Sequence, residues 1–122
     1  MPVAPRINVL EEPGLRVLRF QDRRLWDDST VREVFEQISG ALPRSNEITL
    51  VLDFSQVEAI SSSMLGKLVV LQRKVDAVHG QLRLCELNMQ VRQVLRSTNL
   101  DRLFRIDRDL NESRGNLVKA TA

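Results

Sequence analysis

Hydrophobic residues near the N-terminus gather in two strand-like runs. The runs span residues 7–10 and 15–20, and the segment Glu11-Glu12-Pro13-Gly14 lies between them. Because Pro-Gly is a strong turn signal, this pattern predicts a β-hairpin. Residues 82–87 predict a further strand, and Arg105-Ile106-Asp107 is a candidate for a short final strand.

Three later segments carry apolar residues at the spacing of one helix face. The first has Val31, Val34, Phe35, Ile38 and Leu42; the second has Met64, Leu68, Leu71, Val75 and Val78, widened by Leu65 and Val69; the third has Val91, Val94 and Leu95. Asp27, Asp28 or Ser29 can cap the first helix, and Pro43 should stop it. Gly80 is expected to end the second helix in the left-handed conformation.

The strand predicted at residues 47–54 does not alternate apolar with polar side chains. A strand covered on both faces, as in the middle of a parallel sheet, has this pattern. The order of elements predicts an α/β fold with a mixed, mainly parallel sheet, an N-terminal antiparallel hairpin and about three or four helices. We expect one domain over residues 1–107. Residues 108–122 are polar, and we expect them to form a flexible C-terminal tail.

Composition narrows the class of protein. The 122 residues are 43% hydrophobic and 28% charged, with a formal charge of only +2. So small a basic excess argues against a nucleic-acid partner. The single cysteine excludes an internal disulfide, and no apolar run approaches the ~20 residues that cross a bilayer. We therefore expect a cytoplasmic protein without membrane insertion.

The sequence lacks the residue groupings that enzymes use. Its five glycines are scattered, so there is no phosphate-binding loop, and one histidine with one cysteine cannot make a closed zinc site. A serine nucleophile needs a base, but about 17 residues of helix, roughly 25 Å, would separate Ser62 from His79. We therefore expect no enzyme activity, no metal and no cofactor.

Three single residues allow both a structural and a functional interpretation. His79 suits the C-terminal end of a helix better than it suits catalysis. Cys85 suits a buried position in an apolar strand. Trp26, the sole tryptophan, lies among charged residues. It could be an exposed contact for a partner or fold back onto the sheet, and the sequence leaves both open.

Residues 48–66, ITLVLDFSQVEAISSSMLG, join the central strand to the second helix. Asp53 ends the apolar run, and Ser61, Ser62 and Ser63 open the helix. One serine is enough to cap a helix N-terminus, since its hydroxyl accepts a hydrogen bond from a free N–H group. Three in a row are either plain capping within a small polar loop or the mark of a functional site.

The segment LDFSQVEAISSSMLGKLVVL resembles the signature of the STAS domain, the module of bacterial anti-sigma factor antagonists. That signature is a strand ending in an acid, a short link, and Asp-Ser-Ser-Gly-Leu-Gly opening a helix. The resemblance covers about residues 6–107, including LRLCEL and VRQVLRSTNLDRLFRI. By position, it implies that Ser62 is the serine that a partner kinase phosphorylates and that Ser63 is its neighbour.

The remaining motif positions also carry over, with two departures. Asp53 matches the acid at the strand end, and Leu65 with Gly66 matches the Leu-Gly pair. Ser61 stands where the family has an acid, and Met64 stands where it has the first glycine. Serine can replace aspartate as a helix cap. Met64 is expected to add an apolar side chain to a surface that the family keeps bare.

The resemblance implies a regulatory protein-binding module rather than an enzyme. Its partner would be an anti-sigma factor with serine protein kinase activity, and phosphorylation of Ser62 would switch binding off. The implied partner-binding set lists Asp53, Ser61, Ser62, Ser63, Met64, Leu65 and Gly66. A PP2C-type phosphatase is a second implied partner, and the protein would be a monomer or weak dimer.

Two other functions stay open at this stage. The chain could be a non-phosphorylated STAS subunit with a structural role in a signalling scaffold or a lipid-transport complex. An enzyme or nucleotide-binding domain is the third alternative, which the missing catalytic groupings disfavour.

Overall fold

The computed structural model describes residues 5–117. The main sheet contains β1 (Ile7–Glu12), β2 (Leu15–Phe20), β4 (Thr49–Asp53), β6 (Gln81–Cys85) and β7 (Arg105–Ile106). Two short strands, β3 (Arg24–Leu25) and β5 (Ala59–Ile60), pair separately. The helices are α1 (Asp28–Gly40), α2 (Ser62–Ala77), α3 (Met89–Ser97), the short 3-10 helix η1 (Leu100–Arg102) and α4 (Leu110–Gly115).

The five-stranded sheet has the order β1-β2-β4-β6-β7. Strands β1 and β2 are antiparallel, and every other neighbouring pair is parallel. The hairpin turns at Pro13-Gly14, where Gly14 has a φ of 74°, a conformation that glycine adopts without a Cβ clash. All five residues of β4 are buried, which is the pattern of a central strand. The predicted fold class is therefore confirmed.

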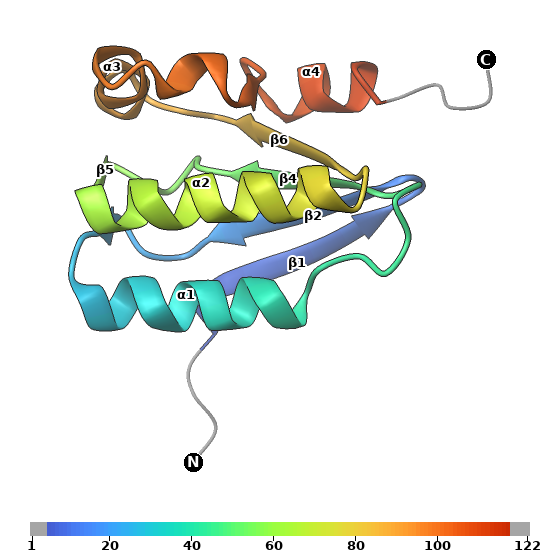
Figure 1. Cartoon of the computed structure of the whole chain (residues 1–122), viewed down its shortest axis with the longest axis horizontal. Coiled ribbons are helices and arrows are strands. Elements are labelled where there is room, and N and C mark those ends of the chain that lie inside the picture. The colour runs from blue at the N-terminus through green and yellow to red at the C-terminus, as the bar shows by residue number, and fades with distance from the viewer. Residues whose placement is uncertain (1–4, 118–122) are drawn as a thin grey trace.

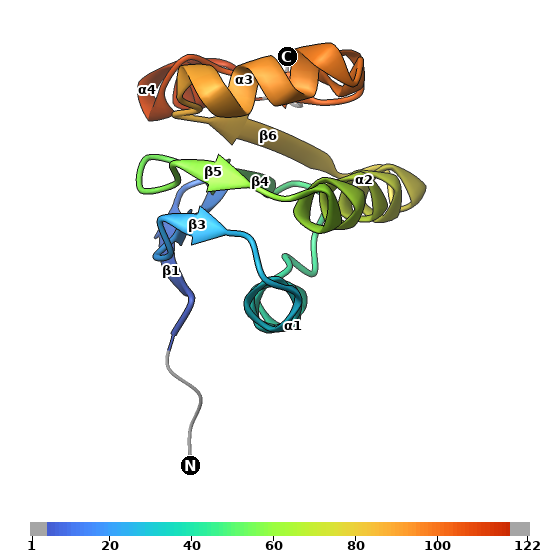
Figure 2. The ribbon, with the colours of Figure 1, turned by 90° about the vertical axis from the view of Figure 1, so that its left-hand side faces the viewer.

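The two faces of the sheet are covered by different helices (Figure 2). Helices α1 and α2 pack on one face, where the core includes Leu18, Leu50, Leu52, Leu82 and Leu84. Helix α4 lies on the opposite face, where a second apolar cluster contains Leu15, Val17, Val51 and Cys85, with Leu110 and Leu117 packed against it. The sheet is therefore an interior layer over much of its area.

Helix α4 differs from the flexible tail that we expected after Asp107. Asp109 caps it by accepting a hydrogen bond from the Glu112 N–H at 2.8 Å. Asp107, only 1% exposed, accepts hydrogen bonds from Arg83 at 2.6 Å and from the Ser113 hydroxyl at 2.6 Å. Hydrogen bonds of polar side chains help to hold this helix in place. Its sequence therefore lacks the repeating apolar residues from which the other helices were predicted. The rest of the predicted tail, 118–122, lies outside the described residues.

The end of α2 also differs from the prediction. His79, rather than Gly80, takes the left-handed conformation, with a φ of 57°. A Cβ at Gly80 would approach the Val75 carbonyl oxygen to 3.3 Å. Glycine is therefore useful at this position because the backbone passes close to the helix. Val78, which we expected on the inner stripe, is 65% exposed because the helix has ended at Ala77.

We predict that Asp107→Asn lowers the free energy of unfolding by about 3 kcal/mol at neutral pH, since it leaves the largely buried Arg83 guanidinium without its counter-charge. Urea denaturation of the two proteins measures the difference. Arg114→Gln is the control, because it breaks the more exposed ion pair with Glu12 and should cost much less. Equal losses for the two variants would contradict a special role for Asp107.

The same pair should make stability depend on acid. Burial by itself raises the pKa of Asp107, but hydrogen bonds from Arg83, Ser113 and Asn116 outweigh it and hold this pKa below its ordinary value. The ionised Asp107 carboxylate therefore contributes fully to the free energy of unfolding above the pKa of the unfolded chain, about 3.9. This contribution disappears as pH falls through the pKa of the folded protein. Urea denaturation should show the difference between wild type and Asp107→Asn shrinking below about pH 4. A constant difference would contradict this linkage.

Candidate functional site

The N-terminus of α2 lies at the carboxyl end of the central strand β4 (Figure 1). After β4, the chain makes a turn in which the Val57 N–H donates to the Phe54 carbonyl at 2.9 Å. It then forms β5, which pairs in parallel with β3, and the Ser61 N–H donates to the Leu25 carbonyl at 3.0 Å. These backbone bonds set the position at which the serines enter the helix.

The three serines divide into one capping residue and two free hydroxyls. Ser61 has extended backbone angles, and its Oγ accepts a hydrogen bond from the Met64 N–H at 3.2 Å. Ser62 and Ser63 lie in the first helical turn and are exposed. Within residues 5–117, neither of these two hydroxyls makes a hydrogen bond. Capping therefore explains Ser61 and leaves the chemistry of Ser62 and Ser63 available.

The electrostatics at this helix end suit an anion. The free N–H groups of a first turn carry a partial positive charge, and the first turn of α2 contains no acidic residue. Lys67 is exposed and lies four positions after Ser63, on the same helix face. Gly66 lies four positions after Ser62, and a Cβ there would meet nothing within 4 Å. The surface beside Ser62 is therefore bare, although packing does not require glycine there.

The predicted partner-binding set splits by exposure. Ser62, Ser63 and Gly66 are exposed and Ser61 is partly exposed, whereas Leu65 is 8% exposed. Met64 is 0% exposed and belongs to the core, so the expected apolar side chain on the surface was wrong. Its position on the inner stripe of the helix, also predicted, is confirmed. The N-terminal cap turns this side chain inward toward the sheet.

Asp53 is buried beneath the site and is not part of its exposed surface. Its carboxylate is 1% exposed, pairs with Arg19 Nε at 2.9 Å and accepts the Ser55 N–H at 2.8 Å. The neighbouring strands β2 and β4 place Arg19 and Asp53 opposite each other in register. The acid at the strand end therefore holds the first residues of the link that leads to Ser61.

Trp26 adds a feature that the sequence left open. It is 60% exposed and follows β3 directly. It forms one wall of a depression of about 430 Å³, with Ile60 and Val94 among the other lining residues. Ile60 is the residue before Ser61, so one lining residue of the depression is next in sequence to the first serine. The pairing of β3 with β5 was not predicted because each strand has only two residues.

The remaining candidate residues have structural roles. Cys85 is fully buried, and this burial raises the pKa of its thiol to about 12, so a reactive thiolate is not available. His79 follows the opposite end of α2 from Ser62. Within residues 5–117, no group of three or more histidine, cysteine or acidic side chains could hold a metal ion. Of the helices in this range, none has the length and apolar character required to span a bilayer.

Comparisons with known proteins agree with this geometry. A family model described as the STAS domain matches residues 6–113. A Thermotoga neapolitana protein, named as an anti-sigma factor antagonist homologue, is 41% identical over 68 residues. That match covers 56% of this chain and 58% of the relative, so it spans less than two thirds of the relative's length.

Solved structures share the fold at low sequence identity. An anti-sigma factor antagonist from Thermotoga maritima has a TM-score of 0.79 and 21% identity, over 91% of this chain and 93% of its own. The phosphorylated form of the Bacillus cell fate determinant SpoIIAA has a TM-score of 0.64 and 19% identity, over 89% of this chain and 96% of its own. These two similarities establish a common fold.

We predict that the three serines differ in their effect on stability. Ser61→Ala should lower the free energy of unfolding by about 1 kcal/mol, because it removes the cap of α2. Ser62→Ala and Ser63→Ala should change it by less than about 0.5 kcal/mol, since their hydroxyls are free. Chemical denaturation of the three variants measures this. A loss at Ser62 as large as that at Ser61 would contradict the division of roles.

Proposed function

The chain belongs to the STAS domain family, and on that premise we propose that it binds an anti-sigma factor with serine kinase activity and is released by phosphorylation of Ser62. The observation that carries the proposal is the free, exposed Ser62 hydroxyl at a helix N-terminus that Ser61 already caps. A kinase can reach this hydroxyl without breaking any hydrogen bond of the described structure.

A phosphate on Ser62 would alter the surface and leave the fold intact. It brings a charge of about −1.5 to −2 at pH 7. The helix N-terminus favours a negative charge, and the Ser61 cap does not involve the Ser62 side chain. We therefore expect the phosphate to weaken the complex and to leave the stability of the domain unchanged. A partner that docks on the free Ser62 hydroxyl would meet an anion at that position instead.

The position of Lys67 distinguishes Ser62 from Ser63. A phosphate on Ser63 would lie four residues before Lys67, which is the spacing of a helical ion pair. A phosphate on Ser62 has Gly66 at the corresponding position and so has no local cation to offset it. Modification of Ser62 thus changes the charge of the docking surface more strongly, which supports Ser62 as the switch residue.

The docking surface would combine the bare turn of α2 with the exposed Trp26. Ser62, Ser63 and Gly66 supply a region without large side chains, and the depression beside Trp26 adds apolar area next to it. Tryptophan is enriched among the residues that contribute most to binding at protein interfaces. A PP2C-type phosphatase would reset the switch at the same exposed hydroxyl.

The Bacillus SpoIIAA structure with which the chain was compared is that of a phosphorylated form. The phosphorylation is that of SpoIIAA, and it is the reason to test the present chain for the same modification. Incubation with the cognate serine kinase and ATP should add one phosphate, which peptide mass spectrometry should locate on Ser62. Ser62→Ala should abolish the modification, and the matched control Ser63→Ala should keep it. Modification at another residue, or none at all, would contradict the proposal.

Binding measurements test the switch itself. Ser62→Ala should keep partner binding, because it removes the site of phosphorylation without adding a charge or disturbing the fold. Ser62→Asp should bind at least about tenfold more weakly, equivalent to about 1.4 kcal/mol. Isothermal titration calorimetry gives both affinities, with Ser63→Asp expected to weaken binding less because Lys67 lies on its face. Equal affinities for the two Ser62 variants would favour the non-phosphorylated scaffold function instead.

A further inference from the structure

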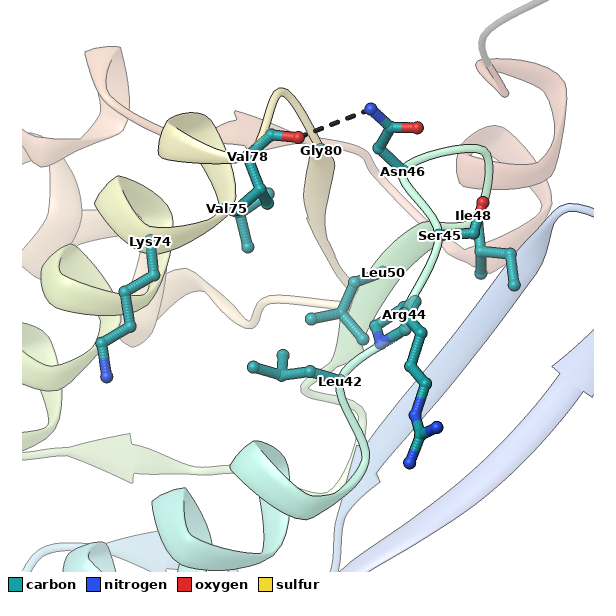
Figure 3. A pocket seen from close by; sticks show the side chains of 11 residues that line it. Leu42, Arg44, Ser45, Asn46, Ile48, Leu50, Lys74, Val75, Val78 and Gly80 are labelled. Atoms are coloured by element: carbon teal, nitrogen blue, oxygen red, sulfur yellow. Dashed lines mark hydrogen bonds between the residues drawn. The ribbon is translucent and has the colours of Figure 1, made fainter.

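A second cavity lies at the opposite end of α2 from the serines. It has a volume of about 530 Å³ and opens between the 42–48 loop and the last turn of α2 (Figure 3). Sixteen residues of helix, about 24 Å, separate it from Ser62. Its volume falls in the range of about 300–1,000 Å³ that is typical of small-molecule sites.

The cavity combines an apolar lining with two basic residues. Leu42, Ile48, Leu50, Val75 and Val78 supply the apolar part. Arg44 and Lys74 are the charged lining residues, and no acidic side chain lines the cavity. Within residues 5–117, neither of these cations takes part in a hydrogen bond or an ion pair. Figure 3 shows the side chains of Leu42 and Leu50 between those of Lys74 and Arg44.

The mouth of the cavity is loosely held. The Asn46 side-chain amide donates to the Val78 carbonyl at 3.5 Å, which joins the loop to the end of the helix (Figure 3). This distance is near the limit for a hydrogen bond, so the bond is weak. Asn46 and Val78 are both exposed. This hydrogen bond is therefore only a weak link between the loop and the end of the helix.

We propose that this cavity, the α2 C-terminal pocket, binds a small amphipathic carboxylate such as a medium-chain fatty acid anion. The aliphatic chain would cover the leucine and valine side chains, and the carboxylate would accept hydrogen bonds from Arg44, with Lys74 on the other side of the leucines adding a longer-range attraction. The carboxyl end of α2 carries a partial negative charge. This partial charge opposes any anion, and it opposes a phosphate dianion more strongly than a singly charged carboxylate. The proposal does not depend on the phosphorylation of Ser62.

The test is a titration of the full-length, ¹⁵N-labelled protein with decanoate, kept below its micelle-forming concentration. Saturable amide shifts are expected at Asn46, Ile48, Val78 and Gly80, with none at Ser62. Decanol has the same chain without the charge, and decyltrimethylammonium carries the opposite charge. Decanol should bind at least about fivefold more weakly, since it loses the charge-assisted hydrogen bonds, and decyltrimethylammonium should cause no shifts at these amides.

Charge variants locate the binding site. Arg44→Gln should weaken decanoate binding by at least about fivefold, since it removes the hydrogen bonds to the carboxylate, and Lys74→Gln should weaken it by about twofold, since it removes a longer-range attraction. Both residues are exposed, so the variants should keep the fold. The matched control is Arg73→Gln, which removes a cation from the adjacent position of α2 that does not line the pocket. The proposal is overturned by the absence of saturable shifts, by equal affinities for decanoate and decanol, or by an Arg73 effect as large as that of Lys74.

Discussion

Parallel pairing on both sides of β4 is the constraint on which the rest of the molecule depends. A strand with parallel neighbours cannot be joined to them by tight hairpins, so the chain must cross over after β2 and again after β4. Helices α1 and α2 are those crossovers, and they cover one face of the sheet. The same requirement brings the N-terminus of α2 to the carboxyl end of β4, where the serines lie. The candidate site is therefore a consequence of topology as much as of the serine run.

The charged groups discussed above form two sets: carboxylates buried in ion pairs, and exposed cations without an ion pair in the described part of the chain. The buried carboxylates Asp53 and Asp107 each pair with an arginine from a neighbouring strand, Arg19 and Arg83. Burial of a charge without such a partner would cost several kcal/mol, about 3–5 by mutational measurements, so these pairs hold the strand ends in place. The charged groups that make no ion pair within residues 5–117 include Lys67, Arg44 and Lys74. All three are exposed, Lys67 near the N-terminal end of α2 and Arg44 and Lys74 beside the pocket at its C-terminal end.

The predictable parts of the fold were those governed by periodicity. The apolar stripes of α1, α2 and α3 and the non-alternating β4 revealed element types, because burial on one or both faces leaves a period in the sequence. Asp27 and Ser61 were recognisable as possible caps from residue type alone, and each caps its helix. Helix α4 and the β3–β5 pair left no such signal, since hydrogen bonds to the distant residues Glu86 and Glu12 help to hold the first and the second has two residues in each strand.

For this protein, the sequence by itself determined the α/β class and the single run of serines, since these depend on local pattern and residue identity. Only the tertiary structure decided which serine hydroxyls are free, that Met64 faces the core and that Trp26 is exposed. It also brought Arg44 and Lys74, thirty positions apart, to the same pocket. The physical reason is that exposure and pairing depend on what packs from distant parts of the chain. The residues next to a side chain in the sequence do not indicate which distant residues will pack against it.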